Sequence, residues 1–574
     1  MAAAHDLVIR NGTLADGLGG ALREADVAVT GSTIDAIGHV PGGGRTEIDA
    51  RGLLVTPGFV DVHTHYDGQA VWDSHLTPSS LHGVTTVVMG NCGVGFAPVK
   101  PQDRETLIQL MEGVEDIPGA ALHEGLDFRW QSFAEYLGVL GARAHDVDVG
   151  AQLPHAALRV FAMGERALLH EKATNSDIAL MRRVAADAMA GGAIGFSTSR
   201  TIHHRSIDGN PTPTLHATEE ELLGIAMGMA DAKRGVMQYV SDWDTPDREH
   251  EFGMVRRLVA SSGRPLSFTL SQRHNEPDGW KAALTLLERA CQDGLPIRAQ
   301  VAPRPAGVLM GLQGSQNPFS DHPSFRAIAK LPLSEQLSAL RDPVFREKLL
   351  AERSTVDERL AASRPLQQFD YMFPFDELPD YEPNREDSVA AIARRERRTC
   401  DEVALDLLLR NDGNSFLFVA LTNYADFSLD VCRAMIEHPL TVAGLGDGGA
   451  HVSYISDANF PTFALSYWGR DRGADRLDLS SLVKRQTADP ARLVRLYDRG
   501  VVAPGMKADL NVIDFDNLRL QTPRMVADLP AGGKRLMQGA DGYAATIVSG
   551  QIVRRHGEAT GALPGRLVKP SDGD

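Results

Sequence analysis

The sequence has few cysteines and no long apolar run. Only four cysteines occur among 574 residues, so a disulfide framework is excluded and a reducing compartment is expected. No stretch of about 18 apolar residues is present, which argues against a transmembrane span. The first residues, MAAAHDLVIRNG, lack the basic and apolar regions of a secretory signal. We therefore expect a cytoplasmic protein that does not act on a membrane.

The chain also lacks any run of basic residues. It carries 58 Lys plus Arg against 75 Asp plus Glu, which gives a formal net charge of −17. Because such a chain repels phosphate backbones, a nucleic-acid partner is not expected. Hydrophobic residues make up 43% and charged residues 23%, which is typical of globular proteins. At roughly 150 residues per domain, the length fits three to four domains or one large barrel with additions.

Both ends of the chain contain short apolar runs separated by turn residues. Residues 6–56 alternate such runs with Asn-Gly and Gly-Ser turns, and the same pattern occurs again only at 508–516 and 544–557. Because neither end has enough strands for a stable sheet alone, we predict one composite β-sandwich domain from residues 1–56 plus 500–565. Two independent hairpins docked on the core are the alternative.

Between the two ends, apolar strands alternate with helical segments. Helix-period segments such as 176–192 and 219–235 end at glycine. This alternation predicts an α/β fold, namely a (β/α)₈ TIM-like barrel within residues 57–499. An open doubly wound sheet is the alternative, but no GxGxxG motif supports it. The expected strands are 54–63, 85–91, 147–153, 193–199, 236–240, 265–270, 296–302 and 441–447.

One connection in this barrel is too long for an ordinary loop. Residues 304–436 exceed the usual few residues of a βα connection. We predict an insertion over the carboxyl-end face of the barrel, serving either as a lid or only as packing decoration.

The sharpest local pattern is PGFVDVHTHYDGQ (57–69). Alternate side chains of a strand point the same way, so His63 and His65 share one direction at the end of an apolar strand. Two imidazoles placed in this way can bind one divalent cation, and Asp67 can orient a ligand histidine from behind. Two solvated histidines on a surface loop are the alternative.

Two further strand ends carry metal-ligand side chains. Cys92 ends the strand in GVTTVVMGNCGVGFAP (83–98), where it can serve as a thiolate ligand or as a small buried hydrophobe. Asp447 closes the last strand in LGDGGAHVS (445–453), where it can ligate a metal and transfer protons, or cap the next helix.

These motifs, in this order, resemble the amidohydrolase superfamily, and most closely its N-acyl-D-amino-acid deacylase (D-aminoacylase) branch. The resemblance covers nearly the whole chain and extends through GAIGFSTS and TADPARLVRLYDRGVVAPGMKADLNVIDFD (487–516). It implies a metal-dependent hydrolase of non-peptide amide C–N bonds, usually with zinc. By position it maps metal ligands onto His63, His65, Cys92 and Asp447, and the catalytic role onto Asp447.

Two ligand positions of the branch are not matched. The branch has a histidine after the fifth strand, where this chain reads MQYVSDWD (237–244), and another after the sixth strand, where Gln272 stands in TLSQRHN (269–275). His274, two residues further on, would need a rearranged loop. We therefore expect one divalent metal, zinc, in the site formed by strands one and eight, and no firm second metal.

Substrate contacts are predicted from position only. The resemblance places them in residues 197–221 and after the third and sixth strands. Basic or amide side chains there can bind an anion or an amide oxygen of the substrate. Side chains that are only solvated are the alternative. The candidates are His155, Arg200, His203, His204, Gln272, Arg273 and His274.

The expected partner is a small-molecule amide. The branch has an arginine-bearing stretch after the DGGAH motif, whereas HVSYISDANFPTF (451–463) has no lysine or arginine, so a free carboxylate on the substrate is not required. A hydantoinase or dihydropyrimidinase-like hydrolase of cyclic amides and a metal-poor binding protein are the alternatives. A homo-oligomer is left open, because aromatic residues such as Tyr467 and Trp468 fit either a core or an interface.

Overall fold

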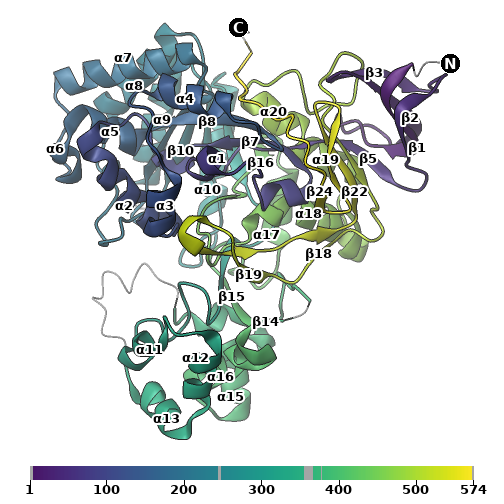
Figure 1. Ribbon diagram of the computed structural model, residues 1–574. Helices are drawn as coiled ribbons and strands as arrows, with labels where there is room; N and C mark the ends of the chain where they lie inside the picture. Colours follow the sequence, from purple (N-terminus) through teal and green to yellow (C-terminus); the bar gives the residue numbers. More distant parts are fainter. Residues whose placement is uncertain (1–3, 244–246, 354–365, 377, 572–574) are drawn as a thin grey trace.

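Eight parallel strands form the central sheet of the molecule. The computed structural model describes residues 4–243, 247–353, 366–376 and 378–571 (Figure 1). The strands are ordered β16-β12-β11-β10-β9-β8-β7-β6, and they match the eight expected strands, so the predicted barrel is confirmed. Their bounds are β6 Phe59–Asp61, β7 Val84–Met89, β8 Asp148–Pro154, β9 Gly195–Arg200, β10 Val236–Ser241, β11 Leu266–Thr269, β12 Ile297–Val301 and β16 Thr441–Ala443.

The barrel is nearly closed by backbone contacts just beyond the first and last strands. The backbone N–H of Asp447 donates to the carbonyl of His63 at 2.9 Å, and that of His65 donates to the carbonyl of Gly448 at 2.7 Å. Thr64 forms a parallel bridge with Gly448. This seam brings the two sequence motifs with metal-ligand side chains against each other.

Helices cover the outside of the barrel (Figure 1). The seventh helix, α7, shows how the sequence sets their limits: Thr174 and Asp177 form a capping box at its start, and Gly192 caps its end with φ 111°. No helix in the described part of the chain has the length and apolar character of a membrane span. The barrel helices are α1 Gln69–Trp72, α2 Arg104–Glu115, α3 Gly119–Gly125, α4 Phe133–Ala142, α5 His155–Met163, α6 Glu165–Leu168, α7 Asn175–Gly191, α8 Glu219–Asp231, α9 Arg248–Ser262, α10 Gly279–Gln292, α17 Asp430–Glu437, α18 Phe460–Phe463, α19 Leu479–Gln486 and α20 Ala488–Leu493.

A second sheet combines strands from both ends of the chain (Figure 1). Its nine strands follow the order β24-β23-β22-β17-β5-β1-β2-β3, with β4 paired to β1. The junction is the antiparallel pair β5–β17, in which Val55 lies opposite Val512, and both side chains are fully buried. The bounds are β1 His5–Leu14, β2 Arg23–Thr30, β3 Thr33–Gly38, β4 Gly44–Asp49, β5 Leu54–Pro57, β17 Leu510–Ile513, β22 Tyr543–Val548, β23 Gln551–Arg555 and β24 Glu558–Ala559.

The long connection between β12 and α17 has a sheet and a hydrophobic cluster of its own. Figure 1 shows its helices as a lobe that projects from the barrel. The side chains of β15 alternate: Leu417 and Val419 pack with the helices of the lobe, whereas Phe416 and Phe418 join the main core. The elements are β13 Gly307–Met310, α11 Pro323–Ile328, α12 Leu333–Arg341, α13 Pro343–Ala351, β14 Met372–Phe375, α15 Val389–Glu396, α16 Cys400–Leu408 and β15 Phe416–Ala420.

Candidate metal centre

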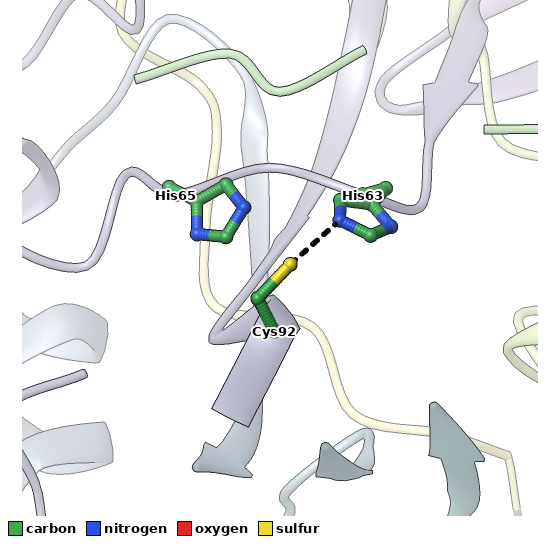
Figure 2. Close-up of side chains that lie close together, drawn as sticks. All are labelled: His63, His65 and Cys92. Atoms are coloured by element: carbon green, nitrogen blue, oxygen red, sulfur yellow. Dashed lines mark hydrogen bonds between the residues drawn. The ribbon is translucent and has the colours of Figure 1, made fainter. Parts of the chain in front are cut away.

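His63, His65 and Cys92 lie together at the carboxyl ends of β6 and β7. One donor atom from each lies within 4.8 Å of the other two, and Figure 2 shows the two imidazoles on either side of the Cys92 thiol. The Nε2 atom of His63 is 3.3 Å from the Sγ atom of Cys92. All three residues are buried, because the seam and the following loops cover them.

Cys92 reaches this position through an unusual backbone conformation. Its φ is 54°, in the left-handed region, and it stands between Gly90 and Gly93, which also have positive φ values. Its backbone N–H donates to Oε1 of Gln238 at 3.2 Å. Burial raises the pKa of the Cys92 thiol well above its usual value, so the thiol keeps its proton unless a cation replaces it.

Asp447 joins the cluster from the other side of the seam. Its Oδ1 atom lies 3.3 Å from Nε2 of His63 and 3.6 Å from Nε2 of His65. Its side chain is 23% exposed, whereas those of the two histidines are 2% exposed. Asp447 therefore marks the side of the cluster that is accessible to a small molecule.

Three separations within this group are those expected between ligands of one cation. Zinc bonds of about 2.0–2.3 Å place neighbouring donor atoms about 3.3–3.6 Å apart. The separations from His63 to Cys92, from His63 to Asp447 and from His65 to Asp447 are 3.3, 3.3 and 3.6 Å. Nitrogen, sulfur and oxygen donors of this kind are those that zinc uses in proteins.

The ring nitrogens that face away from the cluster each lie near a side-chain oxygen. Nδ1 of His63 lies 2.8 Å from Oε1 of Gln300, and the amide of Gln300 is held by its own bond to Ser267 at 2.9 Å. Nδ1 of His65 lies 3.1 Å from Oε1 of Glu115. The Gln300 oxygen favours the tautomer of His63 that leaves its Nε2 lone pair directed into the cluster, whereas the contact between His65 Nδ1 and Glu115 lacks hydrogen-bond geometry.

Glu115 and His451 belong to this site although sequence reasoning did not select them. Oε2 of Glu115 lies 3.7 Å from Nε2 of His451, whose Nδ1 is 3.1 Å from the hydroxyl of Tyr454. Burial raises the pKa of Glu115 well above its usual range and lowers that of His451 to about 4. His451 belongs to the DGGAH motif, whereas Glu115 lies in no motif and gave no signal.

The structure gives Glu115 the position that we predicted for Asp67. The carboxylate of Asp67 accepts the backbone N–H of Gly90 at 2.9 Å, so it fixes the turn that leads to Cys92. The carboxyl group at ion-pair distance from His65 Nδ1 is instead that of Glu115, at the end of α2.

Gln272 and His274 lie where the barrel meets the inserted segment. The backbone N–H of Gln272 donates to Oδ1 of Asn423 at 2.7 Å, and its side-chain carbonyl accepts the N–H of Ala425 at 3.0 Å. The ring of His274 stacks on Tyr371, with 3.9 Å between the centroids. Neither residue belongs to the group of donor atoms formed by His63, His65 and Cys92.

Three other candidates follow β9 and β11. The Nδ1 atom of His204 is 2.9 Å from the hydroxyl of Ser199, and burial lowers the pKa of His204 to about 3. Arg273 contacts Nε2 of His203, and the side chain of His203 is 47% exposed. His203 is therefore the most accessible of the three.

His155 and Arg200 are engaged by partners within the protein. The ring nitrogens of His155 lie 2.8 Å from Thr198 Oγ1 and 2.9 Å from Glu221 Oε1, and the side chain is fully buried. Arg200 donates to Glu251 at 2.8 Å. These contacts explain the two side chains without a ligand.

The family model described as "Amidohydrolase family" matches residues 46–554. The chain belongs to this family. D-aminoacylase of Alcaligenes xylosoxydans xylosoxydans is 36% identical over 221 residues, which cover 38% of this chain and 41% of that enzyme. N-acyl-D-glutamate deacylase of the same organism is 27% identical over 524 residues, 89% of this chain and 88% of the relative.

A solved structure has the same fold as this amidohydrolase. It is N-acyl-D-glutamate deacylase from Bordetella bronchiseptica, complexed with zinc and a phosphonate inhibitor. The match has a TM-score of 0.65 at 23% identity and covers 98% of this chain and 99% of the other.

Proposed function

We propose that this protein is a metal-dependent amidohydrolase that cleaves a non-peptide amide C–N bond, as in the deacylation of N-acyl-D-amino acids. The observation that carries the proposal is that Nε2 of His63 lies 3.3 Å from both Sγ of Cys92 and Oδ1 of Asp447, the separation expected between neighbouring ligands of one tetrahedral cation. Family membership and the deacylase relatives support the choice of an amide as the scissile bond.

One zinc ion is the metal that we propose. His63, His65, Cys92 and Asp447 would hold it, or His63, His65 and Asp447 with a water molecule if Cys92 stays off the metal. Where the branch has its further histidines, this chain has a stretch after the fifth strand without histidine and, after the sixth, Gln272, whose side-chain carbonyl accepts the N–H of Ala425. A second metal is therefore not part of the proposal.

Asp447 is the group that moves protons in this proposal. When bound, the cation would polarise the scissile carbonyl and make its water more acidic. Oδ1 of Asp447 lies beside both histidine Nε2 atoms on the accessible side of the cluster, where it would accept the proton of the attacking water. The same carboxyl group would then donate that proton to the departing amine.

Substrate contacts are assigned to the rim of the site. Arg273 and His203 contact each other at the exits of β11 and β9 and would bind an anionic or carbonyl group of the substrate. The described parts of the inserted segment would serve as a lid over the substrate, because Asn423 of that segment accepts a hydrogen bond from the loop at Gln272.

Metal analysis combined with a substrate panel tests the proposed function. Protein purified without chelator should contain about one equivalent of zinc per chain and should hydrolyse at least one N-acyl-D-amino acid. Activity should disappear on chelation and return when zinc is added. Less than about 0.2 equivalents of zinc, manganese, iron or cobalt would refute the single-metal site.

The substrate panel also separates the competing functions. It contains N-acyl-D-amino acids, their amides and hydantoins, each assayed with and without added metal. Turnover of hydantoins alone would establish a hydrolase of cyclic amides. Binding without turnover would establish a binding protein.

A further inference from the structure

The carboxyl group of Glu115 is buried at the carboxyl end of a helix, where the helix dipole disfavours a negative charge. It is the last residue of α2, whose carboxyl end has partial negative charge, and α2 has no basic side chain in its last turn. The residue is 1% exposed. In the described part of the chain, the ion-pair partners of this carboxyl group are His65 and His451, with no lysine or arginine. Such a position costs stability, so it indicates a function.

The contacts of this carboxyl group point to His65. Oε1 is 3.1 Å from Nδ1 of His65, while the opposite nitrogen of the same ring, Nε2, lies 3.6 Å from Asp447 in the metal cluster. His63 has a neutral amide, Gln300, in the equivalent place. The contact at Nδ1 of His65 is an ion-pair contact without hydrogen-bond geometry. A carboxylate placed against a ligand histidine makes the opposite ring nitrogen a stronger donor.

We propose that Glu115 is the positioning residue of the candidate metal centre. Its carboxyl group lies against Nδ1 of His65, on the side of the ring opposite the cluster, and once a cation is bound it would carry a negative charge that offsets part of the charge of that cation. The inference rests on the proposed function, because it concerns the same centre.

The neighbouring residue fixes the end of α2 in place. Asp116 has φ 50° and terminates the helix. Its carboxylate accepts hydrogen bonds from Ser315 of the inserted segment, at 2.9 Å, and from Ser453 of the loop after the last strand. Glu115 therefore stands on a helix end that is anchored on two sides, as a positioning residue requires.

Zinc affinity of the substitution Glu115→Gln tests the inference. The amide keeps the size of the side chain and removes its charge. The dissociation constant for zinc, measured by competition with a chromophoric chelator, should rise about 10–100-fold. The matched control is Glu105→Gln, an exposed glutamate in the first turn of the same helix, which should bind zinc like the wild type.

The melting temperature of the metal-free protein separates positioning from a structural role. Because the substitution removes a costly buried carboxyl group, metal-free Glu115→Gln should melt at or above the temperature of the metal-free wild type. A clearly lower melting temperature, or a dissociation constant within about twofold of the wild type, would overturn the inference. If the wild type binds zinc and hydrolyses its substrate while Glu115→Gln binds zinc equally well, only this inference fails. If the wild type binds no zinc, the proposed function fails with it.

Discussion

At the scale of single residues, the candidate centre keeps its donors neutral. Burial lowers the pKa of His63, and it lowers that of His65 to about 3, so both imidazoles present free lone pairs at neutral pH. The thiol of Cys92 keeps its proton for the same reason, since burial raises its pKa. The two histidines are therefore ready ligands, whereas Cys92 becomes one only by losing a proton.

Replacing Asp447 by Asn should separate proton transfer from metal binding. The amide oxygen can still occupy the position beside His63 and His65, but it cannot accept and return a proton. We expect kcat to fall about 10²–10⁴-fold while the zinc content stays near that of the wild type. Steady-state kinetics and metal analysis of the same preparation measure both quantities. Full activity of Asp447→Asn would refute the proposed proton transfer.

The sequence was sufficient to group donors that stand at strand ends. His63, His65, Cys92 and Asp447 each follow an apolar run, and parallel strands in a barrel bring such positions to one face. Glu115 could not be found in this way, because it reaches the site from a helix end and its neighbours in the sequence show no pattern.

At the scale of elements, local pattern predicted the strands but not the interior of the insertion. All eight barrel strands were found from their apolar runs, since most residues of each strand are buried. The three-stranded sheet β13-β15-β14 was missed. Its strands are four or five residues long, and Val308 pairs with Val419. A contact over such a distance in the chain leaves no periodic signal.

The seam of the barrel should be sensitive to one added methyl group. A Cβ atom on Gly446 would lie 2.4 Å from Oδ2 of Asp61, and Oδ1 of Asp61 accepts the backbone N–H of His63 at 3.1 Å. Gly446→Ala should therefore destabilise the fold by about 1–3 kcal/mol. It should also weaken zinc binding, because Asp61 and His63 must shift. Urea unfolding and zinc titration measure the two effects.

A glycine in open space provides the control for that substitution. Gly138 lies in the middle of α4, and a Cβ added there meets nothing within 4 Å. Gly138→Ala should stabilise the protein by about 0.5–1 kcal/mol and leave zinc binding unchanged. Wild-type stability and zinc affinity in Gly446→Ala would contradict the role of the seam.

At the scale of the whole molecule, buried ion pairs join the C-terminal part of the chain to the barrel. Arg499 donates to Asp148 at the start of β8, at 2.6 Å, and the side chains are 3% and 0% exposed. Arg554 of the terminal sheet lies 3.3 Å from Asp146. Removing one partner of such a pair leaves a buried charge, so the composite sheet and the barrel depend on each other for stability.

Protonation of His82 should make the stability of the fold sensitive to acid. It is fully buried, with Nδ1 2.8 Å from the hydroxyl of Thr462, while its Nε2–H donates to the carbonyl of Gln538 at 3.0 Å. Burial lowers the pKa of His82 to about 4, from an ordinary value of 6.5. As the pH falls, the unfolded chain binds a proton at His82 before the folded protein does. The stability that neutral His82 contributes is therefore complete above pH 6.5 and is lost as the pH falls toward 4.

Replacing His82 by Gln should therefore flatten the pH dependence of stability. A shift from 6.5 to about 4 corresponds to about 3 kcal/mol. Between pH 7 and pH 4 the free energy of unfolding should fall by about 3 kcal/mol less in His82→Gln than in the wild type. Urea unfolding at each pH measures the difference, and His556→Gln, at an exposed position, should keep the wild-type slope. Equal slopes in His82→Gln and the wild type would show that His82 does not carry this acid sensitivity.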